Sequence, residues 1–131
     1  FERDLDIHEP IGFIHQHALD KLEIAQLDEP VMLHLTCSSR RMDMHDPLLS
    51  IAKRCAKQAI LPEHIYCCGW AGDKGFTTPE LNQAALAPLK AQVPEGCTRG
   101  YSNSRTCEIG LSQHSGVVYQ SILYLVDEVS L

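Results

Sequence analysis

Two adjacent cysteines, Cys67 and Cys68, open a glycine-rich segment that runs to Gly75 and are the residues best suited to chemistry in this chain. A disulfide between neighbouring residues is strained, and two neighbouring thiolates repel each other. A soft metal ion or a metal cluster is therefore the natural ligand of such a pair. The sequence indicates metal or redox chemistry at this segment.

Two further cysteines follow short apolar runs elsewhere in the chain. Cys37 comes after Val31–Leu35, and Cys107 comes after a run that ends at Tyr101. If these runs are buried parallel strands, both cysteines and the adjacent pair lie at or just past strand carboxyl ends. Open α/β sheets assemble their sites at that edge. We therefore expect four thiolates to converge on one point.

Helical and strand patterns alternate along the rest of the sequence. Helices are predicted over His8–Leu22, over a stretch from Asp46-Pro47 to Ala59, and over about Glu80–Lys90. Strands are predicted over Val31–Leu35, His64–Tyr66 and Arg99–Tyr101, and Val118–Val129 is predicted to be a strand that passes into a terminal helix. The sequence thus predicts an α/β fold with a small, mainly parallel sheet flanked by helices.

Length and composition limit the classes of protein to which the chain can belong. Its 131 residues, 44% of them hydrophobic, suit one compact domain with its own core. The net charge of -6 and the interspersed charges argue against nucleic acid as a partner, and we expect no transmembrane segment. Six cysteines in a chain with regular core periodicity favour a reducing cytoplasm. The missing initial methionine suggests a fragment of a longer protein.

Four segments of the sequence resemble a known cysteine-rich domain. They are Thr36–Ser39, Cys67–Phe76, Pro79–Leu81 and Tyr101–Ser112. Together they resemble the CCG domain at the C-terminus of bacterial FAD-linked, iron-sulfur-containing D-lactate dehydrogenases. More distantly, they resemble domains of the glycolate oxidase iron-sulfur subunit and of the cysteine-rich subunit of heterodisulfide reductase. The resemblance runs from about Val31 to the C-terminus, so residues 1–131 are interpreted as a single CCG-type domain with a helical lead-in over residues 1–30.

The resemblance implies an electron-transfer module. An iron-sulfur cluster, expected to be of the 4Fe-4S type, would receive electrons from FAD bound elsewhere in a longer flavoprotein that oxidises D-lactate or a related 2-hydroxy acid. The implied partners are the flavin and ferredoxin-like domains of that protein and a quinone or cytochrome acceptor. The implied location is cytoplasmic, with peripheral attachment at the inner membrane. The isolated domain is expected to be inactive toward D-lactate.

One position departs from the CCG pattern, which ends in Cys-x-x-Cys. Ser104 stands where the first cysteine of that pair would fall, while Cys107 remains. Four cysteines still suffice for an ordinary 4Fe-4S cluster or for a structural zinc ion in a docking domain. A third hypothesis makes Cys67 and Cys68 a catalytic dithiol, but they lack the Cys-x-x-Cys spacing that dithiol catalysts favour.

Gly69, Gly72 and Ser104 are candidate contacts of the cofactor, whereas Cys55 and Cys97 are not. We expect Gly69 and Gly72 to turn the backbone sharply and to point N–H groups at the thiolate sulfurs. Cys55 falls on an apolar helix stripe and Cys97 follows a turn, so both are interpreted as bystanders.

Charged and histidine residues near the predicted site leave alternatives open. His34 is either a core residue or a donor to the edge of the cluster. Arg40, Arg41 and Arg105 either stabilise an anionic cluster or form a solvated rim. His114 is predicted to lie in a loop.

Overall fold

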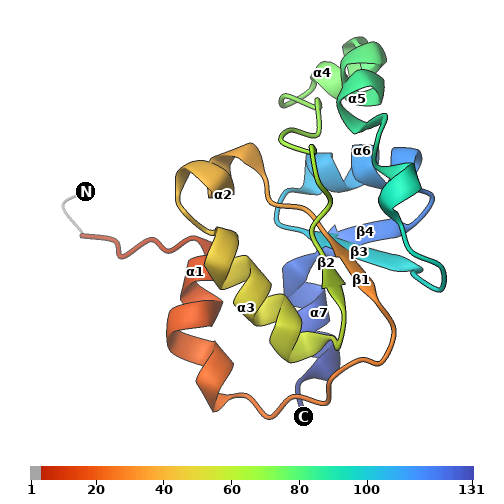
Figure 1. Ribbon diagram of the computed structural model, residues 1–131. Helices are drawn as coiled ribbons and strands as arrows, with labels where there is room; N and C mark the ends of the chain where they lie inside the picture. The colour runs from red at the N-terminus through yellow and green to blue at the C-terminus, as the bar shows by residue number, and fades with distance from the viewer. Residues whose placement is uncertain (1–3) are drawn as a thin grey trace.

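The computed structural model describes residues 4–131 and shows a four-stranded parallel sheet with helices around it (Figure 1). The strands are β1 (Val31–Leu33), β2 (Ala59–Ile60), β3 (Arg99–Ser102) and β4 (Val118–Ser121). Their order in the sheet is β2-β1-β3-β4, and each neighbouring pair is parallel. The predicted α/β fold with a small parallel sheet is confirmed.

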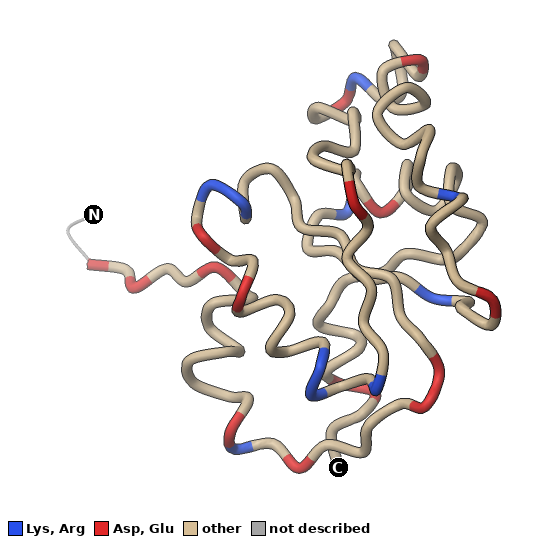
Figure 2. The backbone as a smooth tube through the Cα atoms, viewed as in Figure 1, with Lys and Arg blue, Asp and Glu red and all other residues tan. Residues whose placement is uncertain are grey.

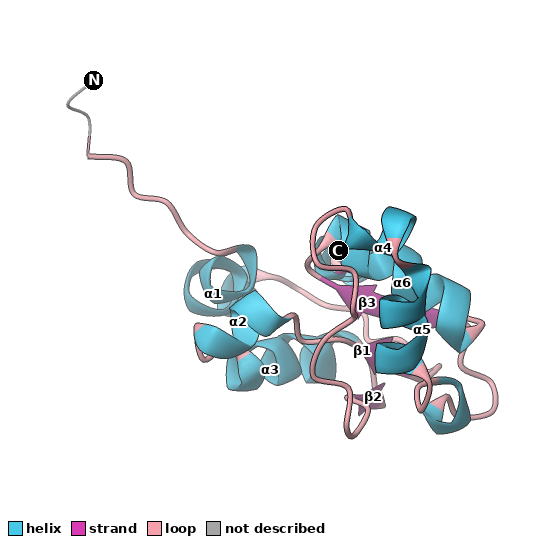
Figure 3. Cartoon of the chain, turned by 90° about the horizontal axis from the view of Figure 1, so that it is seen from above, coloured by secondary structure: helices cyan, strands magenta, loops and turns pink. Residues whose placement is uncertain are grey.

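Helices cover both faces of the sheet, as the view from above shows (Figure 3). They are α1 (Pro10–Phe13), α2 (Cys37–Arg41), α3 (His45–Cys55), α4 (Lys74–Thr77), α5 (Pro79–Leu86), α6 (Arg105–Ser115) and α7 (Ile122–Val129). Side chains of α1, α3 and α7 form one buried cluster, and side chains of α5 and α6 form a second cluster. None of the helices described over residues 4–131 is long and apolar enough to cross a membrane.

Side chains along β1 alternate between these two clusters. Val31, Leu33 and Leu35 belong to the cluster under α3, whereas Met32 belongs to the cluster under α6. The alternation is that of an extended chain, in which successive side chains point to opposite faces. His34 therefore falls on the face of Met32, the face that also holds Cys68 and Cys107.

The predicted helices of the N-terminal half and the predicted C-terminal segment are confirmed in part. Helix α3 buries Leu48, Ile51 and Cys55 on one stripe, as the apolar spacing indicates, but it ends at Cys55 and not at the predicted Ala59, which lies in β2. The predicted helix His8–Leu22 is observed as α1, a π-helical turn over Ile14–Ala18 and a 3-10 turn over Leu19–Lys21. The C-terminal segment is a strand followed directly by a helix, as expected.

The predicted strand His64–Tyr66 is wrong. The strand that pairs with β1 at this edge of the sheet is Ala59–Ile60, with Ala59 opposite Val31. The strand ends early because Pro62 has no N–H group to continue the ladder. Further along, His64 has a φ of 59°, which is incompatible with an extended strand.

Cys107 lies in a helix that follows β3. Helix α6 begins at Arg105 with Ser104 at its N-cap, and Gly116 follows its C-terminus with a φ of 81°. His114, predicted to lie in a loop, is in the last turn of this helix. The predicted helix Glu80–Lys90 is also shorter than expected, since α5 ends at Leu86 and only a 3-10 turn, Lys90–Gln92, follows.

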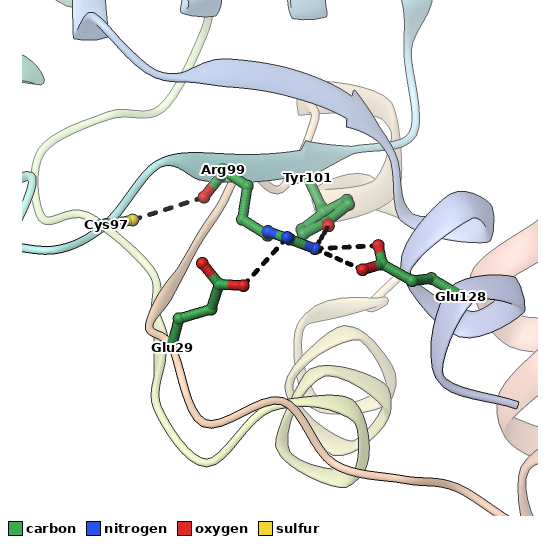
Figure 4. A network of polar contacts seen from close by, with 5 residues as sticks. All are labelled: Glu29, Cys97, Arg99, Tyr101 and Glu128. Atoms are coloured by element: carbon green, nitrogen blue, oxygen red, sulfur yellow. Dashed lines mark hydrogen bonds and ion pairs between the residues drawn. The ribbon is translucent and has the colours of Figure 1, made fainter.

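An arginine on β3 ties three segments together (Figure 4). The Arg99 guanidinium lies 3.0 Å from Glu29 Oε1 and 2.8 and 2.9 Å from the two carboxylate oxygens of Glu128. It also donates to the Tyr101 hydroxyl at 3.5 Å. Because Glu29 precedes β1 and Glu128 lies on α7, this network joins the middle of the sheet to one of its helical layers.

We expect Arg99→Gln to lower the free energy of unfolding by about 1 kcal/mol, because two carboxylates lose a partly buried bidentate partner. Urea unfolding followed by circular dichroism measures the change. Lys57→Gln is the matched control, since its partner Asp28 is fully exposed and the variant should unfold like the parent chain. Equal midpoints for the parent chain and Arg99→Gln would contradict a stabilising role for the network.

Candidate metal centre

The four candidate cysteines lie at the carboxyl edge of the sheet. Cys37 is the first residue of α2, which follows β1, and Cys107 is in the first turn of α6, which follows β3. Cys67 and Cys68 lie in the loop between β2 and α4. Because parallel strands end at the same edge, residues far apart in the sequence are brought to one end of the fold.

Cys68 and Cys107 make direct contact. Their sulfur atoms are 2.7 Å apart, and the Cys68 thiol donates a hydrogen bond to the Cys107 sulfur. The two residues are 4% and 9% exposed and are packed in the cluster that also contains Trp70 and Leu111. The contact joins the glycine-rich loop to the start of α6.

The hydrogen bond shifts the pKa values of the two thiols in opposite directions. It raises the pKa of Cys68, and burial adds to the rise. The same bond lowers the pKa of Cys107, helped by the Ser104 hydroxyl, while burial and the neighbouring thiols Cys37 and Cys67 oppose the shift. Cys107 is therefore the sulfur of the pair that loses its proton more readily, and Cys37 and Cys67 are close enough to act on it.

Cys37 and Cys67 are exposed, unlike the buried pair. The Cys67 sulfur accepts a hydrogen bond from the Gly69 N–H group at 3.3 Å. Across residues 4–131, no three side chains among His, Cys, Asp and Glu are grouped closely enough to hold a metal ion. The structure thus brings Cys68 and Cys107 into contact and leaves Cys37 and Cys67 on the same edge, free of core packing.

Two close approaches hold the loop that carries Cys68. Gly69 has a φ of 71°, and a Cβ atom there would lie 2.5 Å from the Leu81 carbonyl oxygen. The buried side chain of Asn82 donates a hydrogen bond to the Cys68 carbonyl. Gly110 of α6 leaves room for that amide, since a Cβ atom at this position would lie 2.3 Å from Asn82 Nδ2.

Asn82 was not predicted from the sequence. Its only sequence signal is a polar residue on the buried face of a short helix. Gly72 contributes differently from Gly69, because its φ is 73° but a Cβ atom there would meet open space.

A polar network that was also not predicted lies next to Cys37. The Asn103 amide donates to Ser39 Oγ at 2.6 Å and to Glu9 Oε1 at 3.0 Å. The other oxygen of Glu9 accepts from the N–H group of Gly12, at the start of α1. The network attaches the N-terminal helical segment to the carboxyl edge of the sheet, and no local pattern of residues indicates it.

His34 has one satisfied and one unsatisfied ring nitrogen. Nδ1 lies 3.0 Å from Ser102 Oγ, and Nε2 is buried without a partner among the residues that the structure describes. Burial lowers the pKa of His34 to about 4, and the positive charge of Arg40 adds to the shift. The imidazole is therefore neutral at physiological pH.

Cys55, Cys97 and Arg40 are not part of the contact between Cys68 and Cys107. Cys55 belongs to the cluster on the opposite face of the sheet, and burial raises its pKa to about 11. The Cys97 thiol donates to the Arg99 carbonyl at 3.4 Å. The Arg40 guanidinium lies over the Tyr66 ring, 5.6 Å from its centre, and Figure 2 shows acidic and basic residues interspersed along the backbone.

Comparison of this chain with models of protein families, with curated proteins and with solved structures finds no match.

We expect Gly69→Ala to destabilise the domain more than Gly96→Ala. Both glycines have a positive φ, which costs an L-residue about 1–2 kcal/mol, but only Gly69 also faces backbone atoms at contact distance. The free energy of unfolding in urea measures the difference. Equal losses in the two variants would mean that the loop does not pack against α5 as tightly as the structure indicates.

His34 makes the stability of the domain depend on pH. Between about pH 6.5 and pH 4 the unfolded chain binds a proton at this residue and the folded chain does not, so stability falls as the pH falls. The shift corresponds to a loss of about 3 kcal/mol, complete near pH 4. We expect His34→Gln to lack this part of the acid sensitivity.

The measurement is urea unfolding at several pH values between 4 and 7.5. His17→Gln is the control, because His17 is exposed and its replacement leaves the buried His34 in place, so the variant should keep the acid sensitivity of the parent chain. Parallel profiles for the parent chain and His34→Gln would contradict a buried neutral imidazole.

Proposed function

We propose that this chain is an iron-sulfur electron-transfer domain of an FAD-linked D-2-hydroxy acid dehydrogenase of the D-lactate dehydrogenase type. The observation that carries the proposal is the buried contact between the Cys68 and Cys107 sulfurs at the carboxyl edge of the sheet, within electrostatic reach of Cys37 and Cys67. Four cysteine thiolates are the usual ligands of a 4Fe-4S cluster.

The surroundings of the sulfurs support an electron-transfer role. Two of the proposed ligands are buried and two are exposed, so a cluster held by them would lie close to the protein surface. An N–H group at Gly69 already points at the Cys67 sulfur, and such hydrogen bonds raise the potential of a cluster. The resemblance of the segments around these cysteines to the CCG domain points to the same function.

The proposed roles divide the reaction between this chain and its partners. Cys37, Cys67, Cys68 and Cys107 would hold the cluster, and Ser104 would place its hydroxyl beside the Cys107 sulfur. The bound cluster would supply one-electron transfer. A flavin elsewhere in the parent protein would oxidise the D-2-hydroxy acid, and a quinone or cytochrome would accept the electrons.

A structural zinc site in a docking domain is the second candidate. It is favoured by the short separation of the Cys68 and Cys107 sulfurs, because ligands of one ion lie closer together than ligands of separate irons. With Zn–S bonds of about 2.3 Å, tetrahedral geometry places two sulfurs roughly 3.8 Å apart. Zinc gives no visible absorption, so colour separates the two candidates.

The deciding experiment is metal analysis with an absorption spectrum after anaerobic reconstitution with iron and sulfide. We expect about four irons per chain and a broad visible band. Zinc without colour would support the second candidate, and no bound metal would contradict both.

Single serine substitutions test which cysteines bind. Serine at Cys37, Cys67, Cys68 or Cys107 removes one of four thiolates and should reduce the iron content sharply. Cys55→Ser is the matched control and should keep the iron while losing about 1–3 kcal/mol of stability, because it buries a hydroxyl on a helix face. Equal iron in the parent chain and the Cys68 and Cys107 variants would contradict the site.

Restoring the missing cysteine is the converse test. The Ser104 side chain lies beside Cys107 and makes no capping hydrogen bond to α6, so Ser104→Cys should place a fifth thiol at the site. We expect this variant to retain more iron than the parent chain after exposure to a chelator. Unchanged iron retention would mean that position 104 does not reach the cluster.

A further inference from the structure

We propose that Cys68 and Cys107 form a reversible disulfide when the domain holds no metal, with hydrogen peroxide as the oxidant. The two sulfurs are already in contact at 2.7 Å, across 39 residues of sequence. The two sulfurs can therefore form a disulfide bond without a rearrangement of the backbone. The disulfide is a modification that neither the fold nor the proposed electron transfer requires.

The other cysteines are poorly placed to compete for this bond. All six are free thiols, and the hydrogen bond between Cys68 and Cys107 is the only one that joins two sulfurs within residues 4–131. Cys67 adjoins Cys68, and a disulfide between neighbours is strained. Cys55 belongs to the cluster across the sheet, and Cys97 donates to a backbone carbonyl.

Cys107 is the sulfur expected to react first. It is the third residue of α6, an eleven-residue helix, and its sulfur accepts the hydrogen bond from the Cys68 thiol. Cys107 is also the more exposed of the two, at 9% against 4% for Cys68. A small oxidant such as hydrogen peroxide suits a sulfur that is so little exposed.

The reaction balances in two steps. The Cys107 thiolate attacks one oxygen of hydrogen peroxide, which breaks the O–O bond, forms a sulfenic acid and releases hydroxide. The Cys68 sulfur then attacks the Cys107 sulfur, forms the S–S bond and displaces hydroxide. The two hydroxides take up the two thiol protons, so two electrons from the pair have reduced one peroxide to two waters. A dithiol reductant reverses the bond by thiol-disulfide exchange.

The bond would control metal loading, and this consequence rests on the proposed function. A disulfide between Cys68 and Cys107 removes two of the four thiolates that the proposed site needs. The oxidised domain would then take up no cluster until a dithiol reduces it.

The test uses the full chain after anaerobic treatment with a chelator. One equivalent of hydrogen peroxide is added, free thiols are blocked with iodoacetamide in denaturant, and the protein is digested with trypsin. Cleavage after lysine and arginine places Cys68 in residues 58–74 and Cys107 in residues 106–131. We expect these two peptides to be linked and two hydrogen atoms lighter than their sum, with Cys55 and Cys97 alkylated.

Three variants identify the sulfurs. Cys67→Ser should keep the link, which assigns it to Cys68 within the shared peptide. Cys97→Ser, a buried cysteine of the same cluster, is the matched control and should also keep it. Cys107→Ser should lose it. Alkylation of all six cysteines in the peroxide-treated parent chain, or a link carried by Cys67 or Cys37, would overturn the proposal, and neither result depends on how the Cys107 variant folds.

Metal uptake separates this inference from the proposed function. A chain that forms the link but binds neither iron nor zinc when reduced would refute the metal site and support the disulfide. A chain that binds iron when reduced but shows no link after peroxide would refute the disulfide alone. If both are correct, peroxide abolishes iron uptake by the metal-free chain and dithiothreitol restores it.

Discussion

The parallel pairing of β1 with both β2 and β3 is the constraint on which the rest of the structure depends. Because all three strands run in the same direction, each chain segment leaves the sheet at the same edge. Cys37 leaves after β1 and Cys107 leaves after β3, while the loop after β2 carries Cys67 and Cys68. One antiparallel strand would send its cysteine to the opposite end of the domain.

The alternation of side chains across the sheet then sorts the cysteines by face. Cys55 packs under one face with Leu33 and Leu48, where its apolar surroundings make it a core residue. Cys68 and Cys107 pack under the other face, beside Trp70. Cys97 shares that face but donates its thiol to a backbone carbonyl. The same residue type thus has different roles, because each backbone position presents it to a different environment.

The two proposals assign the Cys68–Cys107 pair two chemically exclusive states. In them the sulfurs would either bind a common metal centre or bind each other, and the surroundings that would prepare one state would also prepare the other. Asn82 and the close approach at Gly69 hold the loop, and the first turn of α6 holds Cys107. A rigid scaffold of this kind is what a metal site requires, and it also brings two thiols within bonding reach.

Local sequence patterns determined the elements whose signals are themselves local. The apolar run at Val31–Leu35, the stripe of α3 and the strand-to-helix passage after Val118 were predicted because spacing within a few residues specifies them. The strand Ala59–Ile60 was not predicted, because two residues are too few to show an alternation of apolar and polar side chains. The strand forms because its backbone pairs with β1, which no local pattern indicates. The helical start at Ser104 was missed although its cap and Gly116 are local signals.

The tertiary structure alone decided which groups meet. The contact of Cys68 with Cys107, the bond from Asn82 to the Cys68 carbonyl and the link from Glu9 to Asn103 join residues far apart in the chain. The sequence was enough to predict that four cysteines lie at one edge of the sheet. That prediction needs only the order of the strands along the chain and their common direction. The sequence could not say which two are buried in contact and which two face solvent, because that depends on packing between segments whose separation along the chain leaves no local trace.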